Sequence, residues 1–315
     1  MKKLSLSFLS ALLIPFLFSC SDENDNPPAA DLNAPEIGFA EGRDSFRPME
    51  GEVRSASTDH MHVRFSVSDD SGIGQVLVDI HNSFDGHTHG RLNNTFTALN
   101  VKDIYSPDAS QPFLRFPEGA TFLNVDGSAT DIYWEGPTSR VENNVLAGPY
   151  DIIISAVDVN GNQTSFGDDS NYLATFYIER PYAPMISVTN LHDGEIEGDA
   201  GEALEVVGSV AKAGHELSSE ITFLWVRLVE EDHDHDHNHR VSGEEFYEKV
   251  WGTSAWRDGM SGPDLPNGEE LKFEDIFTGD NAIILPEGED HLDLIIWAED
   301  ANGNITRKVY EVHID

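Results

Sequence analysis

The chain has 315 residues and a formal net charge of −38 at pH 7, from 57 acidic and 19 basic side chains. Such a charge repels phosphate backbones, so we expect no nucleic-acid partner. Length alone suggests about two domains. The acidic residues are spread along the chain, which is typical of a solvated surface, and such a surface attracts cations.

The first predicted element is a signal peptide. The basic pair Lys2-Lys3 precedes an apolar run from Leu4 to Phe18, which is too short to span a membrane comfortably. Cys20 follows as the only cysteine. Because it has no second cysteine to pair with, a stray cysteine is the less favoured alternative. The stretch resembles a bacterial lipoprotein signal peptide, which implies that residues 1–19 are removed and Cys20 is lipidated.

A short acidic tether over residues 20–32 comes next. It opens with SDEND at 21–25. An acidic stretch directly after the lipidated cysteine resembles the surface-export signal of Bacteroidetes lipoproteins. The resemblance implies an outer-membrane location, with the lipid as anchor and the protein exposed at the cell surface. The Pro-Pro pair stiffens an otherwise flexible linker.

The remaining chain has the composition of β-strands. Runs of β-branched and aromatic residues, alternating with period two in places, are separated by Gly, Asn, Asp and Pro. No long helical period is convincing. The predicted strands are 63–69, 75–80, 150–158, 175–179, 221–229, 292–300 and 309–314, with long irregular stretches at about 91–148 and 240–288. We therefore predict an all-β protein.

The sequence also repeats itself. The matching segments are AVDVNGNQT (156–164) with AEDANGNIT (298–306), and NAPEI (33–37) with YAPMI (182–186). The repeats predict two tandem domains, residues 33–180 and residues 181–315. Each is expected to be an immunoglobulin-like β-sandwich, enlarged by its irregular stretch.

The Asn-Gly pair in each repeat predicts a type I′ hairpin turn. A calcium loop is the alternative for D-x-N-G-N. The helix-loop-helix calcium motif, however, needs Gly at its sixth position and Glu at its twelfth. In the first repeat these positions hold Gln163 and Asp169, so the turn is favoured.

The whole arrangement resembles a group of Bacteroidetes surface lipoproteins with tandem Ig-like modules, classed as a domain-of-unknown-function family (DUF4625). The resemblance rests on the lipobox, the A-P-x-I openings, the histidine-bearing segments and the A-x-D-x-N-G-N-x-T hairpins. It implies the fold and the surface location but no activity.

Histidines concentrate after two equivalent strands. FDGHTHGR (84–91) follows the strand at 75–80, and EDHDHDHNHR (231–240) follows the strand at 221–229. Because successive strands of a sandwich run in opposite directions, we expect distant histidines to converge at one end of each domain. The expected groups are His60, His62, His81, His87 and His89 in the first domain, and the tract with His192, His291 and His313 in the second. Taken singly, His192, His291 and His313 fit ordinary surface histidines better.

Neutral imidazole is a ligand for zinc and other divalent transition metals. In an extended segment, histidines two residues apart point the same way, and the alternating aspartates attract cations. The predicted metal ligands are His60, His62, His81, His87, His89, His233, His235, His237 and His239. We expect zinc capture and delivery to an outer-membrane metal receptor. The alternative is a low-complexity tract that binds metal incidentally.

No catalytic motif for a nucleophile, zinc hydrolase or phosphate loop is present, so we expect no enzyme. A second interpretation is a glycan- or protein-binding cell-surface module with no physiological metal role. In that case Trp251 and Trp256 are the candidates for stacking on sugar rings. Core packing is the alternative for both indoles.

Overall fold

The computed structural model describes residues 31–84, 95–230 and 244–315. Strands dominate this part of the chain. Its only α-helix is the single turn α1 (Phe273–Ile276), and three 3-10 turns accompany it, η1 (Pro112–Leu114), η2 (Ser128–Thr130) and η3 (Gly279–Asn281). The prediction of an all-β protein is confirmed. In the described ranges no helix is long and apolar enough to cross a membrane.

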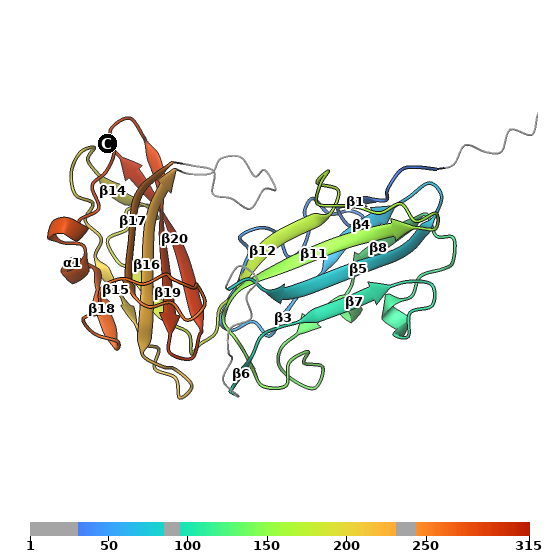
Figure 1. Ribbon diagram of the computed structural model, residues 1–315, viewed down its shortest axis with the longest axis horizontal. Coiled ribbons are helices and arrows are strands. Elements are labelled where there is room, and N and C mark those ends of the chain that lie inside the picture. The colour runs from blue at the N-terminus through green and yellow to red at the C-terminus, as the bar shows by residue number, and fades with distance from the viewer. Residues whose placement is uncertain (1–30, 85–94, 231–243) are drawn as a thin grey trace, which may run out of the picture. The chain divides into compact units, whose positions relative to one another are not determined.

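The N-terminal strands, β1 to β12, form a five-stranded sheet in the order β2-β12-β11-β5-β7 and a three-stranded sheet in the order β1-β4-β8 (Figure 1). Their bounds are β1 (Glu36–Gly38), β2 (Val53–Arg54), β4 (Arg64–Ser68), β5 (Ile73–Asn82), β7 (Val101–Tyr105), β8 (Phe122–Asp126), β11 (Gly148–Asp158) and β12 (Tyr172–Ile178). Two short pairs complete the set, β3 (His60–Met61) with β9 (Ile132–Tyr133) and β6 (Phe96–Thr97) with β10 (Asn144–Val145).

The C-terminal strands, β13 to β20, repeat this plan with a five-stranded sheet β14-β20-β19-β16-β17 and a three-stranded sheet β13-β15-β18 (Figure 1). Their bounds are β13 (Met185–Val188), β14 (Ile196–Gly198), β15 (Gly208–Ala211), β16 (Ile221–Glu230), β17 (Glu245–Gly252), β18 (Glu270–Lys272), β19 (His291–Asp300) and β20 (Ile305–Ile314).

Each pair of sheets encloses apolar side chains from both members. Phe65 of β4 and Val78 of β5 belong to one buried cluster. Val210 of β15 and Leu224 of β16 belong to another. Buried side chains alternate with exposed ones along β7 and with partly buried ones along β12, which places one face of each strand inward. This is the immunoglobulin-like sandwich pattern that the sequence predicts.

Among the described strands, no sheet combines strands from before and after residue 181. Residues Asn33–Asp315 nevertheless form one compact unit. The division into domains 33–180 and 181–315 therefore stays a prediction. All seven predicted strands are confirmed, with small shifts of their ends. The eight-residue strand β17, however, was missed, because it lies inside the stretch that we expected to be irregular.

The type I′ prediction for the Asn-Gly turns is wrong. A type I′ turn needs positive φ at both central residues, but only the glycines Gly161 and Gly303 have it, at +94° and +86°. The Asp158 carboxylate explains the difference. It accepts hydrogen bonds from the backbone N–H of Asn160 and of Asn162 at 2.9 and 2.7 Å, and φ of Asn160 is not positive.

Candidate metal centres

The predicted metal ligands fall into two groups by their place in the chain. His87, His89, His233, His235, His237 and His239 lie outside the described residues, as does the lipidation candidate Cys20. His60, His62 and His81 are described. The structure therefore tests the convergence of histidines only through these three and through His192, His291 and His313.

Cluster 1 consists of His60, His62 and Asp131. One ligand atom from each lies within 4.8 Å of the others. His60 ends up here because β3 pairs with β9, which places it opposite Tyr133, whose ring stacks on the imidazole at 4.9 Å. Asp131 directly precedes β9. The short β3–β9 ladder thus brings together residues 69 positions apart.

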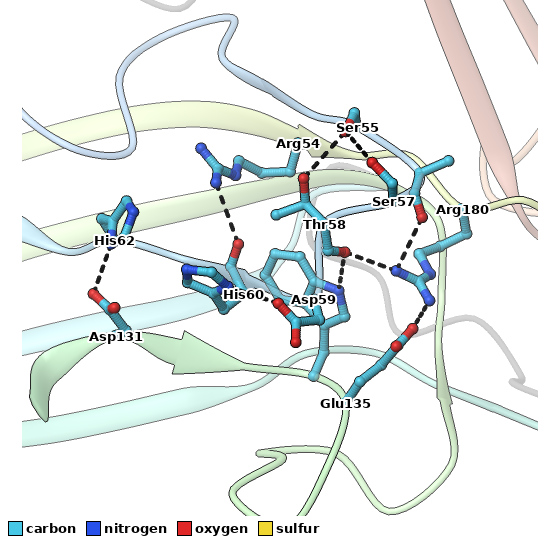
Figure 2. A network of polar contacts seen from close by, with 12 residues as sticks. Arg54, Ser55, Ser57, Thr58, Asp59, His60, His62, Asp131, Glu135 and Arg180 are labelled. Atoms are coloured by element: carbon cyan, nitrogen blue, oxygen red, sulfur yellow. Dashed lines mark hydrogen bonds and ion pairs between the residues drawn. The ribbon is translucent and has the colours of Figure 1, made fainter. Parts of the chain in front are cut away.

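Carboxylates already orient both imidazoles of cluster 1 (Figure 2). Nδ1 of His60 lies 2.7 Å from Oδ1 of Asp59, and Nδ1 of His62 lies 2.9 Å from Oδ1 of Asp131. The hydrogen bond with His60 holds the pKa of Asp59 below its usual range. A carboxylate on one ring nitrogen fixes the ring and leaves the other nitrogen for a metal, as Asp59 does for His60. Asp131 becomes the third metal ligand of cluster 1 only if it gives up its contact with Nδ1 of His62.

His81 does not join cluster 1, contrary to the prediction. It lies on β5 opposite Asp151, and its Nδ1 is 3.0 Å from Oδ1 of Asp79. The prediction assumed that all the histidines at one end of the sandwich come within ligand distance of one another. His81, however, lies in the five-stranded sheet, whereas His60 belongs to the separate β3–β9 ladder. Of His60, His62 and His81, only His60 and His62 share a metal-binding arrangement.

Cluster 2 consists of Glu195, His291 and His313, with ligand atoms that also lie within 4.8 Å of one another. His291 begins β19 and His313 is near the end of β20, and the antiparallel register pairs them directly. Their ring centroids are 4.9 Å apart. The predicted convergence of His291 and His313 is confirmed.

A tight turn supplies the carboxylate of cluster 2. His192 and Glu195 exchange backbone hydrogen bonds at 2.8 and 3.0 Å, and the two residues between them, Asp193 and Gly194, have φ of +51° and +107°. Positive φ at both central residues is the type I′ pattern that Asp-Gly favours. His192 also reaches this end of the sheet, because its Nδ1 lies 2.7 Å from Oε1 of Glu197. Glu197 in turn pairs with His313 in the β14–β20 ladder.

The imidazoles of cluster 2 are only partly satisfied. Nδ1 of His291 is buried and lies 3.3 Å from Oε1 of Glu311, but within the described structure it makes no hydrogen bond. Nε2 of His313 is 3.6 Å from Oδ1 of Asp315. Polar atoms at such positions usually have a partner. A cation is a chemically suitable partner for these ring nitrogens.

The histidine tract (His233, His235, His237 and His239) lies outside the described residues, but the residues on both sides of it are described. Glu230, the last residue of β16, pairs with Leu292 of β19, next to His291. On its other side the chain resumes at Glu244, whose carbonyl accepts the N–H of Glu230 at 3.0 Å. The described residues that flank the tract, Glu230 and Glu244, therefore lie near His291 of cluster 2.

Both clusters suit zinc better than magnesium or calcium, because they combine imidazoles with one carboxylate. Zinc bonds of about 2.0–2.1 Å in tetrahedral geometry hold ligand atoms about 3.4 Å apart. The ligand atoms of each cluster lie within 4.8 Å of one another, so binding of zinc requires the side chains to move closer together. Three protein ligands leave one position of a tetrahedron open, which suits exchange of the metal.

The two tryptophans proposed for sugar stacking are buried. Trp251 is 5% exposed and Trp256 is 6% exposed. The Trp251 ring packs against Phe277 at 6.1 Å, and the Trp256 indole donates a 2.9 Å hydrogen bond to the carbonyl of Gly303. With no free ring face, neither can stack on a sugar. The alternative of core packing is correct, because β17 carries Trp251 into the sandwich.

Residues 18–113 match the family described as Domain of unknown function (DUF4625). The predicted resemblance to this family is confirmed over these residues, which include Cys20, His60, His62 and His81. The description assigns no activity, and the lipoprotein setting stays a prediction. No curated protein matches the chain.

Several solved structures align with the chain. The fibronectin(III)-like modules of Clostridium thermocellum CbhA align at 12% identity over 89% of this chain and 94% of theirs, with a TM-score of 0.22. Bacteroides ovatus SGBP-B, solved with a mixed-linkage heptasaccharide, aligns at 12% identity over 88% of this chain and 47% of its own, with a TM-score of 0.23. Dimeric latent PorU from Porphyromonas gingivalis aligns at 12% identity over 94% of this chain and 21% of its own, with a TM-score of 0.24. The chain spans less than half the length of the last two proteins, and similarities this weak carry no functional inference.

Proposed function

We propose that the protein captures divalent transition metal, zinc first, at cluster 2 and cluster 1, with the histidine tract raising the number of bound ions. One observation carries the proposal. Two imidazoles paired across β19 and β20 share with Glu195 a volume in which every pair of ligand atoms is within 4.8 Å. The setting is a lipid-anchored protein on the outer surface of the outer membrane, and it works as a binding protein rather than an enzyme.

The charges around cluster 2 favour a cation. Two positions along the same ladder from the His291–His313 pair, and so on the same face of the sheet, Asp293 and Glu311 oppose each other. Like charges in this position destabilise a sheet, and a bound cation relieves the repulsion. Because metal binds neutral imidazole, protons compete with it and binding weakens as the pH falls.

The ligand number indicates a role in capture and release. Three residues that leave a coordination position open hold a metal less firmly than a closed four-ligand site. Such a site can pass the ion to another ligand, which fits delivery to an outer-membrane metal receptor. The acidic surface, at a net charge of −38, raises the local cation concentration around the chain.

Calorimetric zinc titration of the tract-free chain, in which His233, His235, His237 and His239 are alanine, tests the proposal. We expect binding to persist and to weaken at least about tenfold when His291 or His313 is also replaced by alanine, which is about 1.4 kcal/mol or more. The matched control is His215→Ala, since His215 belongs to neither cluster. A tract-free chain that binds zinc no more tightly than a short histidine peptide would refute the proposal.

A further inference from the structure

His192 lies beside cluster 2 but is not one of its three ligands. It faces Glu195 across the tight turn, because the two residues form an antiparallel bridge. Directly opposed residues of an antiparallel pair lie on the same face, with Cβ atoms about 4.5–5.5 Å apart. Glu195 supplies the carboxylate of cluster 2. The turn therefore keeps His192 next to a proposed zinc ligand.

Glu197 holds the ring of His192 near a second ligand of the cluster. Nδ1 of His192 lies 2.7 Å from Oε1 of Glu197. Glu197 is the direct neighbour of His313 in the parallel β14–β20 ladder, and adjacent strands of a sheet are about 4.7–4.9 Å apart. The backbone of His192 is thus tied to Glu195, and its side chain is tied to the neighbour of His313.

The contact between His192 and Glu197 is the arrangement of a metal-binding histidine. A carboxylate at Nδ1 orients the ring and leaves Nε2 for a metal. The equivalent contact of a cluster 2 ligand, between Nδ1 of His291 and Oε1 of Glu311, is longer at 3.3 Å. His192 therefore has the ring orientation of a ligand without belonging to the three-residue group.

The side chain of His192 can also move at low cost. It is 71% exposed, and its partner Glu197 is 50% exposed. An ion pair at such an exposed position contributes about 0–1 kcal/mol, so the imidazole gives up little when it turns away from Glu197. His291 and His313, in contrast, lie on two long strands that pair over their length.

We propose that His192 is an exchangeable fourth ligand of cluster 2, with Glu197 as its positioning residue. This inference rests on the proposed capture of zinc at cluster 2. When Glu195, His291 and His313 hold an ion, Nε2 of His192 takes the open tetrahedral position and closes the site. When His192 leaves, the position reopens and an incoming ligand can take the ion. His192 thus regulates the release of the captured metal.

Long-range ¹H–¹⁵N NMR of the imidazole nitrogens, during a zinc titration, tests the ligand set. The sample is the tract-free full-length chain with His62→Ala, so that cluster 1 is also removed. We expect a nitrogen resonance of His192 to move to the zinc-bound position together with those of His291 and His313. Movement at His291 and His313 alone would overturn this inference and leave zinc capture intact. Movement at none of the three would refute zinc capture at cluster 2, and this inference with it.

Stopped-flow release of zinc from the same chain into excess chelator tests the regulation. A tethered ligand acts at high effective concentration, so His192→Ala should speed release about tenfold. Glu197→Gln should speed release less, because His192 stays a ligand but its ring loses the orienting carboxylate. The matched control is His215→Ala, which should leave the rate unchanged, since His215 belongs to neither cluster. A release rate that His192→Ala leaves unchanged, or that His215→Ala changes equally, would overturn the proposal.

Discussion

His291 and His313 face each other as directly paired residues of β19 and β20, with ring centroids 4.9 Å apart. Slipping this register by one residue would turn every side chain of a strand to the opposite face. The buried residues Leu292 and Val312, which are paired next to the histidines, prevent such a slip. The core of the sandwich thus fixes the distance between two metal ligands on its rim.

The histidine tract should add capacity rather than create the ordered site. Replacing His233, His235, His237 and His239 by alanine should lower the number of zinc ions bound per chain. The tightest binding step should change by less than about twofold, because its ligands lie on the sheet. Equilibrium dialysis with zinc measures both quantities. Complete loss of binding in this variant would place the function in the tract alone.

Cluster 1 should bind its own ion. In the tract-free chain, His62→Ala should remove one zinc ion and leave the affinity of cluster 2 unchanged, since the clusters share no residue. His81→Ala is the matched control, because His81 belongs to neither cluster, and it should have no effect. If His81→Ala also removed an ion, the original prediction of a larger first-domain site would be restored.

The turn between His192 and Glu195 should control the geometry of cluster 2. Gly194 has φ of +107°, where a β-branched residue is strained by about 1–2 kcal/mol. Gly194→Val should therefore displace Glu195 and weaken zinc binding by the tract-free chain about tenfold. Asp193→Gly keeps a residue that tolerates positive φ and should bind normally. Equal zinc affinities for the two variants would show that Glu195 is not a ligand.

Asp300 should make the fold less stable as the pH rises. It is fully buried, and burial raises its pKa to about 6, against hydrogen bonds from Asn304 and nearby backbone N–H groups that lower it. Because the folded pKa exceeds that of the unfolded chain, the stabilisation is present below about pH 4 and is lost as the pH rises to about 6. The loss attributable to Asp300 is about 2–3 kcal/mol.

Urea unfolding of the wild type and of Asp300→Asn between pH 3.5 and about 7 checks this prediction. The substitution should remove the part of the decline in unfolding free energy with rising pH that is due to Asp300. This holds even if the substitution also changes the unfolding free energy by a pH-independent amount. Identical pH slopes for the two proteins would mean that the buried carboxylate does not titrate in this range.

The sequence predicted the long strands well and the turns less well. Segments such as 221–229 are apolar enough to specify a buried strand on their own. β17 mixes charged and aromatic residues, and only its pairing with β16 makes it a strand. The type I′ prediction for the Asn-Gly turns failed because the Asp158 and Asp300 carboxylates accept hydrogen bonds from the backbone N–H groups of these turns.

The candidate sites were predictable only in part. The tract and the pair His60 and His62 stand out in composition, and topology placed His291 and His313 at one end of a sandwich. Glu195 carries no such signal, being one of 57 acidic residues. The Asp-Gly pair beside it is the one local sign, since a type I′ turn makes His192 and Glu195 cross-strand neighbours. Asp131 belongs to cluster 1 through a contact with His62, 69 positions away in the chain. No local sequence pattern reveals such a contact.

Anomalous diffraction at the zinc edge, from crystals of the full chain grown with zinc, tests the central claim most directly. We predict a peak at cluster 2, about 2.0–2.1 Å from one ligand atom each of Glu195, His291 and His313. A well-ordered β19–β20 strand pair with saturating zinc and no peak between the two imidazoles would contradict the account.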